Sequence, residues 1–402
     1  MDIISELLNK NKWAEFLDYK LTKSHLNKTE QNFLINFVEN QKYLQIAQQI
    51  SLETYTFSTP KKTLINKSGS GKKRVVYSFN QYENIILKFI SFCLYKYDYR
   101  FTKNTYAFRR NITVKQAFTN LAKTKNINKM FSYKIDISNY FNSINISILL
   151  PKLKSFLTED VRLFELFKNI LTTNECLFNG LKITEQRGVM AGTPISTFLA
   201  NVFLLDLDEY FTNNNVVYAR YSDDIILFSE NLNFLNEYKN YIINYLQKID
   251  LTINPNKVSL TKPNCKWSYL GFSYDNGIID LSDVTLKKIK DKIRRKARAI
   301  YRWKIKNNKD TLHAAKVLIR VFNNKFYKIE QTKDLTWSRW FFPVINTDQT
   351  IKVVDDYLVQ YIRFLQSGKF TKKNYNLTYQ KIKELGFKSL VHEFYNFRNG
   401  KF

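Results

Sequence analysis

The sequence predicts an α+β fold in which short apolar strands are combined with many helices. Two apolar runs, Val216 to Ala219 and Ile225 to Phe228, flank the segment Tyr221 to Asp224 and indicate the arms of a β-hairpin. A second apolar strand with an embedded carboxylate is expected within residues 131–142. Elsewhere the apolar residues recur mostly with helical spacing, so helices should form most of the chain.

The N-terminal part combines helices with one basic strand. Residues 1–55 have helical periodicity and no residues that suggest chemistry. A turn-rich basic segment extends from Pro60 to Arg74, and the β-branched run Val75 to Tyr77 follows it. A helix is then expected from about Gln81 to Tyr97.

The middle of the chain is expected to place the hairpin between helices. Helical patterns extend to about residue 175. A glycine-rich turn region, Gly188 to Gly192, leads into one long apolar helix over about 193–211. After the hairpin we expect a helix over about 232–249 and a strand-like piece near 269–274.

From about Val284 the chain becomes strongly basic. One predicted helix carries nine positive residues within 16 positions, with Asp291 as the acidic neighbour. Such a run is usually a solvated helix face, but this density favours a surface that follows a nucleic-acid backbone. The last ~70 residues are expected to be helical. They contain the aromatic cluster Trp337 to Phe342, which is interpreted as core rather than as a base-stacking platform.

The composition indicates a globular protein with a polyanionic partner. Hydrophobic residues make up 44% and aromatic residues 16% of the 402 residues, which excludes a disordered chain. Lys and Arg number 63 against 35 Asp and Glu, so the net charge is +28. A general enrichment in Lys and Asn is the alternative explanation, but it would not suppress acidic residues so far. Nucleic acid is therefore the favoured partner.

Cysteine usage and the absence of long apolar runs suggest a soluble cytoplasmic protein. Cys93, Cys176 and Cys265 are widely spaced and contain no CxxC pair, which argues against a disulfide framework or a zinc site. No signal peptide is visible at the amino terminus. Charged residues interrupt every apolar stretch before the ~20 residues of a membrane span, so no membrane partner is expected.

Three aspartates on two predicted strands indicate a metal site. Asp223 and Asp224 are adjacent at the tip of the hairpin, and Asp136 lies in the upstream strand. Neighbouring carboxylates repel each other and lose hydration unless a positive charge lies between them. Mg²⁺ suits such hard oxygen ligands, and a two-metal phosphoryl-transfer centre uses several of them. The alternative is that these are ordinary turn residues, because turns accept Asp and Ser freely.

Taken in order, several segments resemble the palm and fingers motifs of reverse transcriptases, over roughly residues 60–305. The order of these motifs is more specific than any one of them. The matching segments are a basic strand (Gly71 to Val75), a Phe-Arg segment (Asn104 to Arg109), the first aspartate motif (Asp136 to Phe141), the motif Gly192 to Asn201, the Tyr-x-Asp-Asp box (Tyr221 to Asp224) and two further palm motifs (Leu251 to Lys257 and Leu270 to Phe272).

The resemblance implies a two-metal nucleotidyltransferase. Asp136 and Asp223 would bridge two Mg²⁺ ions, with Mn²⁺ as an alternative, and Asp224 would support metal binding less directly. Ile137 is grouped with them as a metal ligand. Lys257 is a candidate proton donor to pyrophosphate, and the equally weighted alternative is a solvated loop lysine.

The resemblance also implies contacts to the nucleotide and to nucleic acid. Lys73 and Arg74 would meet the β- and γ-phosphates of a dNTP. Phe141 would exclude a ribose 2′-hydroxyl or serve as a core aromatic, and Gly192 would let the backbone approach the nucleotide closely. The remaining expected contacts are Arg109 and Ser196 with the substrate, Leu270, Gly271 and Phe272 in the primer grip, and Lys288, Lys292, Arg295 and Arg298 with nucleic acid.

The sequence departs from the family pattern at two positions. Ala191 replaces the usual Gln before Gly192, which removes a polar group near the nascent base pair, and Thr197 replaces the usual Pro after Ser196. Among reverse transcriptases the chain is most similar to the bacterial defence-associated ("unknown group" and abortive-infection-like) enzymes, which are related to group II intron and retron enzymes. No retron thumb motif, HNH cluster or RNase H pattern is found.

The expected fold is therefore a right-hand polymerase with helical N- and C-terminal segments. The palm is an antiparallel sheet backed by helices, the fingers are mixed and the thumb is helical. The expected domains are an N-terminal helical segment at 1–59, fingers at 60–130, a palm at 131–281 with a fingers insertion at about 145–185, a basic thumb at 282–330 and a C-terminal helical extension at 331–402.

Three hypotheses of function are considered, and RNA-directed DNA synthesis is the leading one. The first is copying of a structured, dedicated non-coding RNA in antiphage defence, with dNTPs as substrates and DNA as product. The second is template-independent or protein-primed DNA synthesis of the abortive-infection type. The third is an RNA-binding or maturase-like module, against which the three intact aspartates argue. A homo-oligomer or a second defence protein is left open as a further partner.

Overall fold

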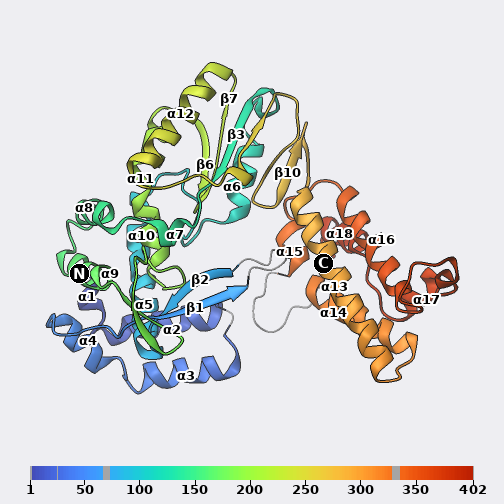
Figure 1. The fold of residues 1–402 in the computed structure, drawn as a ribbon, viewed down its shortest axis with the longest axis horizontal. Helices are drawn as coiled ribbons and strands as arrows, with labels where there is room; N and C mark the ends of the chain where they lie inside the picture. The colour runs from blue at the N-terminus through green and yellow to red at the C-terminus, as the bar shows by residue number, and fades with distance from the viewer. Residues whose placement is uncertain (1, 25, 67–72, 328–335, 402) are drawn as a thin grey trace. The chain divides into compact units, whose positions relative to one another are not determined.

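The computed structural model of the protein describes residues 2–24, 26–66, 73–327 and 336–401 (Figure 1). The chain forms two compact units, Met1–Pro263 and Asn264–Phe402. The sequence predicts a palm that ends at residue 281, whereas this division groups the last strands of that region with the helices that follow. The domain boundaries stay predictions. Gly71 of the expected basic strand and residues 328–335 at the expected end of the thumb lie outside the described residues.

Four helices form the N-terminal part of the first unit, as the periodicity predicts. Asn27 precedes α3 and forms a capping box with Glu30. The Asn27 side chain accepts a hydrogen bond from the Glu30 backbone amide, and the Glu30 carboxylate accepts one from the Asn27 backbone amide. Trp13 is fully buried and stacks on Phe89 of α5 with 4.0 Å between ring centroids. The four helices in the described part of residues 1–55 are α1 (Ile3–Glu6), α2 (Lys10–Lys23), α3 (Lys28–Glu39) and α4 (Leu44–Ser51), and α5 (Gln81–Cys93) follows later in the chain.

A mixed four-stranded sheet follows, in the order β2-β1-β4-β5. Its strands are β1 (Lys61–Asn66), β2 (Lys73–Ser78), β4 (Glu175–Phe178) and β5 (Leu181–Thr184). The sequence prediction is wrong for β1, which lies in the segment expected to be turns, and it misses β4 and β5. Asn179 and Gly180 join β4 to β5 with φ values of 51° and 84°. An Asn-Gly pair is a strong hairpin signal, because both residues tolerate positive φ.

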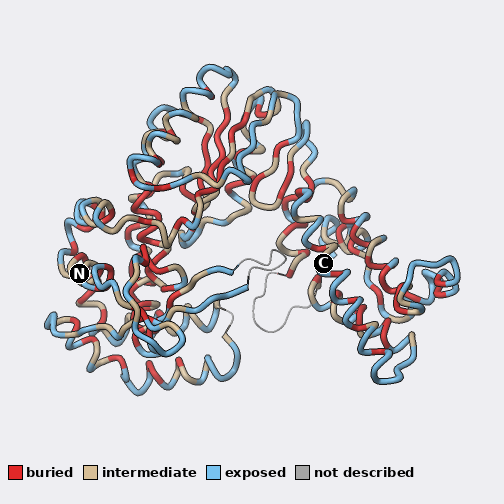
Figure 2. The backbone as a smooth tube through the Cα atoms, viewed as in Figure 1, coloured by how far each residue is buried: buried red, intermediate tan, exposed pale blue. Residues whose placement is uncertain are grey.

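A second four-stranded sheet, β6-β7-β3-β8, carries the aspartates. All of its pairings are antiparallel. The inner strands β7 and β3 each bury four of their six residues, which agrees with the apolar runs that predict them, and Figure 2 shows buried positions along them. Its strands are β3 (Phe131–Asp136), β6 (Val217–Tyr221), β7 (Asp224–Ser229) and β8 (Ser259–Thr261).

Helices cover this second sheet. α12 packs on β3 and β7, while α6 and α11 pack on β6 (Figure 1). The single helix expected over 193–211 is wrong: the chain leaves helical dihedrals at Leu204 (φ −103°, ψ 12°) and forms two helices. The helical elements are η1 (Leu94–Arg100), α6 (Val114–Ala122), η2 (Ile127–Lys129), α7 (Tyr140–Ser143), α8 (Ile146–Phe156), α9 (Val161–Thr172), α10 (Ser196–Phe203), α11 (Leu205–Asn213), α12 (Leu232–Lys248) and η3 (Pro255–Lys257).

The second unit joins a small antiparallel sheet to a helical bundle. The sheet has the order β11-β10-β9. The long basic helix α13 buries Ile289, Ile293, Ala297 and Ile300, whose spacing forms one apolar stripe against α14 and α16. Its elements are β9 (Trp267–Tyr269), β10 (Phe272–Asp275), β11 (Ile278–Leu281), α13 (Asp283–Lys306), α14 (Thr311–Tyr327), α15 (Trp337–Phe341), α16 (Gln349–Phe364), η4 (Lys372–Asn376), α17 (Tyr379–Glu384) and α18 (Leu390–Arg398).

The observed architecture is thus α+β with antiparallel strand pairing in the sheet that carries the aspartates, as the sequence predicts. Across the described residues, no helix is long and apolar enough to cross a membrane.

Candidate active site

The register of three strands brings the aspartates to one end of the second sheet. Asp136, the last residue of β3, pairs with Asp224, the first residue of β7. The two-residue loop Ser222-Asp223 closes the hairpin, with Ser222 at φ 62°. The amide of Ile137 donates to the carbonyl oxygen of Asp223 at 3.1 Å, so the hairpin tip is fastened to the end of β3.

The electrostatics of the three aspartates reflect this proximity. Burial, together with the charges of Asp223 and Asp136, raises the pKa of Asp224 to about 6, although Lys134 at 3.9 Å opposes the shift. Burial and the charge of Asp136 likewise raise the pKa of Asp223. Raised carboxylate pKa values at a site of this kind indicate negative charges that would be stabilised by a bound cation.

Lys257 neutralises part of this charge. It lies on η3, beyond the end of β3, and its Nζ is 2.5 Å from Oδ2 of Asp136. The amide of Asn254 donates to the Asp136 carbonyl at 2.8 Å, which holds this turn beside the strand. Lys257 therefore reaches the acidic cluster, as a proton donor would have to, while its side chain stays 56% exposed.

The donor set fits a divalent metal chemically. Carboxylate oxygens are the ligands that Mg²⁺ prefers, and the mutual repulsion of the three aspartates would be relieved by a cation. The Ile137 side chain is a buried hydrocarbon, so its carbonyl oxygen is what it could offer to a metal. As the side chains stand within the described ranges, no three His, Cys, Asp or Glu residues are grouped as a formed metal site.

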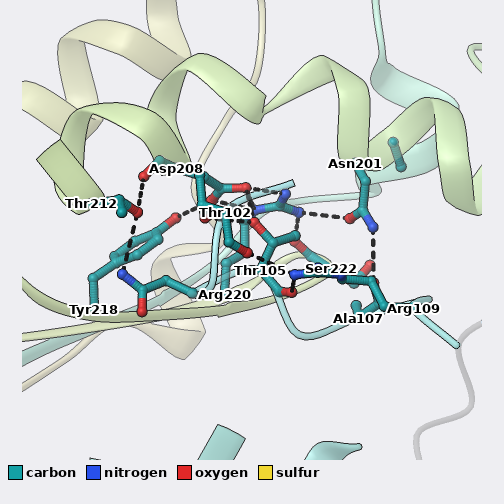
Figure 3. Close-up of polar contacts among 12 residues, drawn as sticks. Thr102, Thr105, Ala107, Arg109, Asn201, Asp208, Thr212, Tyr218, Arg220 and Ser222 are labelled. Carbon is teal, nitrogen blue, oxygen red and sulfur yellow. Dashed lines mark hydrogen bonds and ion pairs between the residues drawn. The ribbon is translucent and has the colours of Figure 1, made fainter. Parts of the chain in front are cut away.

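A buried polar network lies under the hairpin (Figure 3). Arg220, the residue before the Tyr-x-Asp-Asp box, is fully buried, as is Asp208 of α11. The Arg220 Nε is 2.8 Å from Oδ1 of Asp208, and a second guanidinium nitrogen contacts Oδ2, so the pair is bidentate. Tyr218 and Thr105 also donate to the Asp208 carboxylate, at 2.8 and 2.6 Å. The buried negative charge is thus fully surrounded by donors.

The same network reaches the turn that carries Asp223. Nη1 of Arg220 donates to the carbonyl oxygen of Ser222 and to Oδ1 of Asn201, both at 3.2 Å. Asn201 in turn donates to the carbonyl of Ala107 at 2.8 Å, and Figure 3 shows the guanidinium between Asp208 and Asn201. The sequence predictions quote Asn201 within a motif but miss Arg220 and Asp208. Arg220 and Asp208 are charged residues at otherwise apolar positions of their strand and helix patterns, and this is the signal that could have found them.

Three aromatic side chains form a row that begins at Tyr221, the strand partner of Asp224. Phe141 follows Asp136 by five residues and is half-buried, with its ring 6.0 Å from that of Phe108. Phe108 adopts φ 60°, is 38% exposed and lies 6.2 Å from the ring of Tyr221. The position predicted to select the sugar is therefore partly accessible rather than sealed in the core.

Asn142, which the sequence predictions do not single out, joins three segments next to Phe141. Its Nδ2 donates to the carbonyl of Val75 in β2 at 3.2 Å, and its Oδ1 accepts from the amide of Ala191 at 3.0 Å. Gly188 packs directly on this helix: a Cβ there would lie 2.3 Å from the carbonyl oxygen of Phe141. The loop before α10 is thus held against both β2 and α7.

Gly192, Ser196 and Arg109 have structural contacts in this arrangement. A Cβ at Gly192 (φ 101°) would lie 3.1 Å from the carbonyl oxygen of Tyr77, so here the close approach is to β2. The buried hydroxyl of Ser196 donates to the Thr193 carbonyl at 2.7 Å. Arg109 donates to the carbonyls of residues 98, 102 and 105 and so holds its own loop. These contacts account for all three residues without a substrate.

Lys73 and Arg74 begin β2 and are exposed. Asn66 pairs with Lys73 and Ile65 with Arg74, so both cations lie at one end of the β1–β2 hairpin. Their side chains are available to an anionic ligand.

The expected primer grip and basic surface lie in the second unit. Leu270 and Gly271 both have positive φ, 50° and 93°, and form the turn between β9 and β10. The carbonyl of Gly271 accepts from the hydroxyl of Thr285 at 2.8 Å, which fixes this turn on α13, and Phe272 is buried. The four predicted nucleic-acid contacts on α13 are exposed: Lys288, Lys292, Arg295 and Arg298.

A buried sheet that presents three aspartates at one end is an arrangement that metal-dependent phosphoryl-transfer enzymes use. Residues 59–274 match the family model described as "Reverse transcriptase (RNA-dependent DNA polymerase)". This match covers more than half of the chain, so the protein belongs to the reverse transcriptase family and is a nucleotidyltransferase. Members of this family generally use divalent metal ions.

Two telomerases are among the solved structures that align with the chain. The apo telomerase of Candida tropicalis truncated from the C-terminal domain has a TM-score of 0.44 and 16% identity, and the alignment covers 56% of this chain and 55% of that one. The telomerase of Candida albicans in complex with a TWJ fragment of telomeric RNA has a TM-score of 0.44 and 11% identity, covering 90% and 70%. Similarities this low add nothing to the family assignment. None of the curated proteins compared with the chain matches it significantly.

Proposed function

We propose that the protein extends a DNA strand on an RNA template by two-metal phosphoryl transfer at Asp136, Asp223 and Asp224. The supporting observation is the strand register that pairs Asp136 with Asp224 and places Asp223 at the adjacent turn. Asp136 lies far from Asp223 and Asp224 in the sequence, and the pairing of β3 with β7 brings the three carboxylates to one end of the sheet. Such a site suits a reaction in which an oxyanion attacks a polyphosphate.

The chain would hold two Mg²⁺ ions, or Mn²⁺, through Asp136 and Asp223, with Asp224 and the Ile137 carbonyl in support. When bound, the ions would lower the pKa of a primer 3′-hydroxyl and stabilise charge on the leaving pyrophosphate. Lys257 is placed to keep a proton beside this reaction, because its ammonium already contacts the carboxylate of Asp136.

Selection of the nucleotide falls to residues on the first unit. Lys73 and Arg74, exposed at the end of β2, supply two positive charges for the β- and γ-phosphates. Phe141 presents a half-buried ring near the aspartates, where it would exclude a ribose 2′-hydroxyl. Gly192, Ser196 and Arg109 are proposed to shape the nucleotide site indirectly, since their observed contacts are to the protein backbone.

The second unit is proposed to bind nucleic acid. The turn Leu270–Phe272 is the proposed primer grip, and the exposed cations of α13 would follow a phosphate backbone. A net charge of +28 favours a polyanion over a small anionic ligand alone. That the template is a dedicated structured non-coding RNA, and that the enzyme acts in cytoplasmic antiphage defence, rests on the resemblance to defence-associated enzymes. The proposal that a second copy of the chain or a second defence protein is a partner rests on the same resemblance.

The decisive experiment substitutes one metal ligand. Asp223→Asn keeps the shape of the turn but removes a charge, so it should abolish incorporation of dNTPs on an RNA template while RNA binding persists. Asp18→Asn is the matched control, because it makes the same change at an exposed position of α2 and should leave incorporation unchanged. Wild-type incorporation in the Asp223→Asn enzyme would refute the site.

Template-independent or protein-primed synthesis is a second candidate, favoured by Ala191. This residue contacts the protein through its backbone alone, its amide with Asn142 and its carbonyl with Tyr77, so no polar side chain is present there. Products made with and without added RNA, resolved before and after protease treatment, distinguish the candidates. RNA-dependent, protease-insensitive products support copying, whereas RNA-independent products that shift after protease support protein priming.

A further inference from the structure

The structure separates the aromatic cluster 337–342 into two parts with different surroundings. Phe341 and Phe342 are buried, as expected of core residues. Trp337 and Trp340 remain partly exposed and line a cavity of about 430 Å³ at the surface of the second unit. The interpretation of the whole cluster as core is therefore wrong for the two indoles.

The cavity combines aromatic rings with positive charge. Three helices of the second unit form it: α13, α14 and α15. Two of its lysines come from successive turns of α13 and the third from α14. Its lining is Thr285, Lys288, Ile289, Lys292, Lys325, Trp337, Trp340 and Phe341, and none of these described residues is acidic.

Two of the three lysines, Lys292 and Lys325, lie close enough to disfavour each other's charge. Burial, followed by the charge of Lys292, lowers the pKa of Lys325. Like charges gathered in a concave site are relieved by an anion, so the cavity favours an anionic occupant over a neutral one. Lys288 and Lys292 are exposed, which leaves their ammonium groups accessible to that occupant.

The aromatic side chains that line the cavity restrict the kind of occupant further. Trp337 is held in place by the buried rings of Phe326 and Phe341, with centroids 5.3 and 4.8 Å away. Buried Ile289 closes the base. A rigid, partly exposed indole beside lysines binds a planar base and its phosphate together, as single-strand binding proteins do. The volume lies within the range of about 300–1,000 Å³ typical of small-ligand sites.

We propose that this cavity binds one unstacked nucleotide of a single-stranded nucleic acid, with the base against Trp337 and Trp340 and the phosphates at Lys288, Lys292 and Lys325. The exposed cations farther along α13 would contact phosphates alone, so the cavity adds base-dependent affinity to a charged surface. The choice of nucleic acid as the polymer rests on the proposed function, but the cavity and its test do not depend on catalysis.

The test compares a labelled single-stranded oligonucleotide with an abasic oligonucleotide of equal length, by fluorescence anisotropy without dNTPs or metal. The wild-type protein should bind the base-bearing strand at least about 5-fold more tightly, because stacking on an aromatic side chain contributes that much per base. Trp340→Leu should remove most of this preference. Equal wild-type binding of the two strands, or an unchanged preference in Trp340→Leu, would overturn the proposal.

A charge variant keeps the test valid if Trp340→Leu perturbs the fold. Lys292→Gln combined with Lys325→Gln should weaken binding of the base-bearing strand more than binding of the abasic strand. The matched control is Lys287→Gln combined with Lys296→Gln, two exposed positions of α13 that do not line the cavity. The control should weaken binding of both strands equally. An equal effect of the cavity pair on both strands would contradict a built nucleotide site.

This outcome is separable from that of the proposed function. An enzyme that incorporates dNTPs yet shows no base preference would reject the cavity and keep the polymerase. An enzyme with the preference but no incorporation would keep the cavity and reject the polymerase.

Discussion

Nζ of Lys257 lies 2.5 Å from Oδ2 of Asp136, so a lysine and the proposed metal share one carboxylate. The lysine comes from η3 and is more than half exposed, which leaves it free to move when a cation binds. The ion pair therefore links metal binding to the position of the candidate proton donor.

Lys257→Gln should lower both the Mg²⁺ concentration needed for half-maximal activity and the maximal rate. Without a competing ammonium, half-maximal activity should need less Mg²⁺. Loss of a general acid should lower the maximal rate by about 10²–10⁴-fold. A Mg²⁺ titration of dNTP incorporation measures both effects. A lower rate with an unchanged Mg²⁺ requirement would support Lys257 as a proton donor but would show that it does not compete with Mg²⁺ for Asp136.

Arg220 should contribute both to stability and to the position of the catalytic turn. Arg220→Met leaves Asp208 buried without its partner, and breaking a buried pair costs about 3–5 kcal/mol of unfolding free energy. The more exposed pair Arg294–Asp291 on α13 is the matched control, and Arg294→Met should cost about 1 kcal/mol or less. Urea unfolding of the two variants gives the comparison.

A double variant separates the two contributions of Arg220. Arg220→Met with Asp208→Leu removes both buried charges and should recover much of the lost stability. Activity should stay low, because the Ser222 carbonyl still lacks its donor from Arg220. Full recovery of the incorporation rate together with stability would show that Arg220 does not position the turn.

Phe141→Ala should admit ribonucleotides. Its half-buried ring lies near the aspartates, so removing it opens space for a 2′-hydroxyl. The ratio of kcat/KM for dNTP to that for rNTP should fall at least about 10-fold, equivalent to about 1.4 kcal/mol. Phe108→Ala, which removes the neighbouring ring, is the control and should change the ratio less. Unchanged sugar selectivity in Phe141→Ala would assign the ring to packing alone.

Gly188→Ala should destabilise the protein more than Gly277→Ala. Both positions have positive φ, which costs a residue with a Cβ about 1–2 kcal/mol. At Gly188 the added carbon would lie 2.3 Å from the Phe141 carbonyl, whereas nothing lies within 4 Å at Gly277. Overpacking should add about 1–3 kcal/mol at Gly188 alone. Equal losses in denaturant unfolding would show that the loop yields without strain.

The stability of the metal-free protein should fall as the pH rises from about 4 to 6. The folded-state pKa of Asp224, about 6, lies above the ordinary value of 3.8, so in this window the folded state binds the proton more tightly. The loss is complete above pH 6. It amounts to at most about 3 kcal/mol, since one pKa unit is about 1.4 kcal/mol.

Asp224→Asn removes this pH-dependent loss. With chelator present, the variant should be more stable than the wild type at pH 7.5 and nearly equal to it at pH 4, because the wild-type carboxyl is then largely protonated in the folded state. Urea unfolding at several pH values measures the difference. A difference that does not vary with pH would remove the titration of Asp224 as its cause.

Several features could be predicted from short stretches of sequence. The two apolar runs predict β6 and β7, and the adjacent aspartates indicate a charged tip that the strand register confirms. The Asn-Gly pair between β4 and β5 carried an equally local signal that the predictions overlooked. The break of the expected long helix at Leu204 had no such signal, because neither Gly nor Pro occurs between Ser196 and Asn213.

The residue order alone establishes the family, the strand that bears Asp136 and the hairpin that bears Asp223 and Asp224, because motifs and periodicity are local properties. Tertiary structure alone decides that Arg220 joins Asp208 to the turn, and that two indoles and three lysines line one cavity. These contacts join residues from separate elements, and their side chains meet only once the elements pack. The spacing of residues along the chain therefore does not predict these contacts.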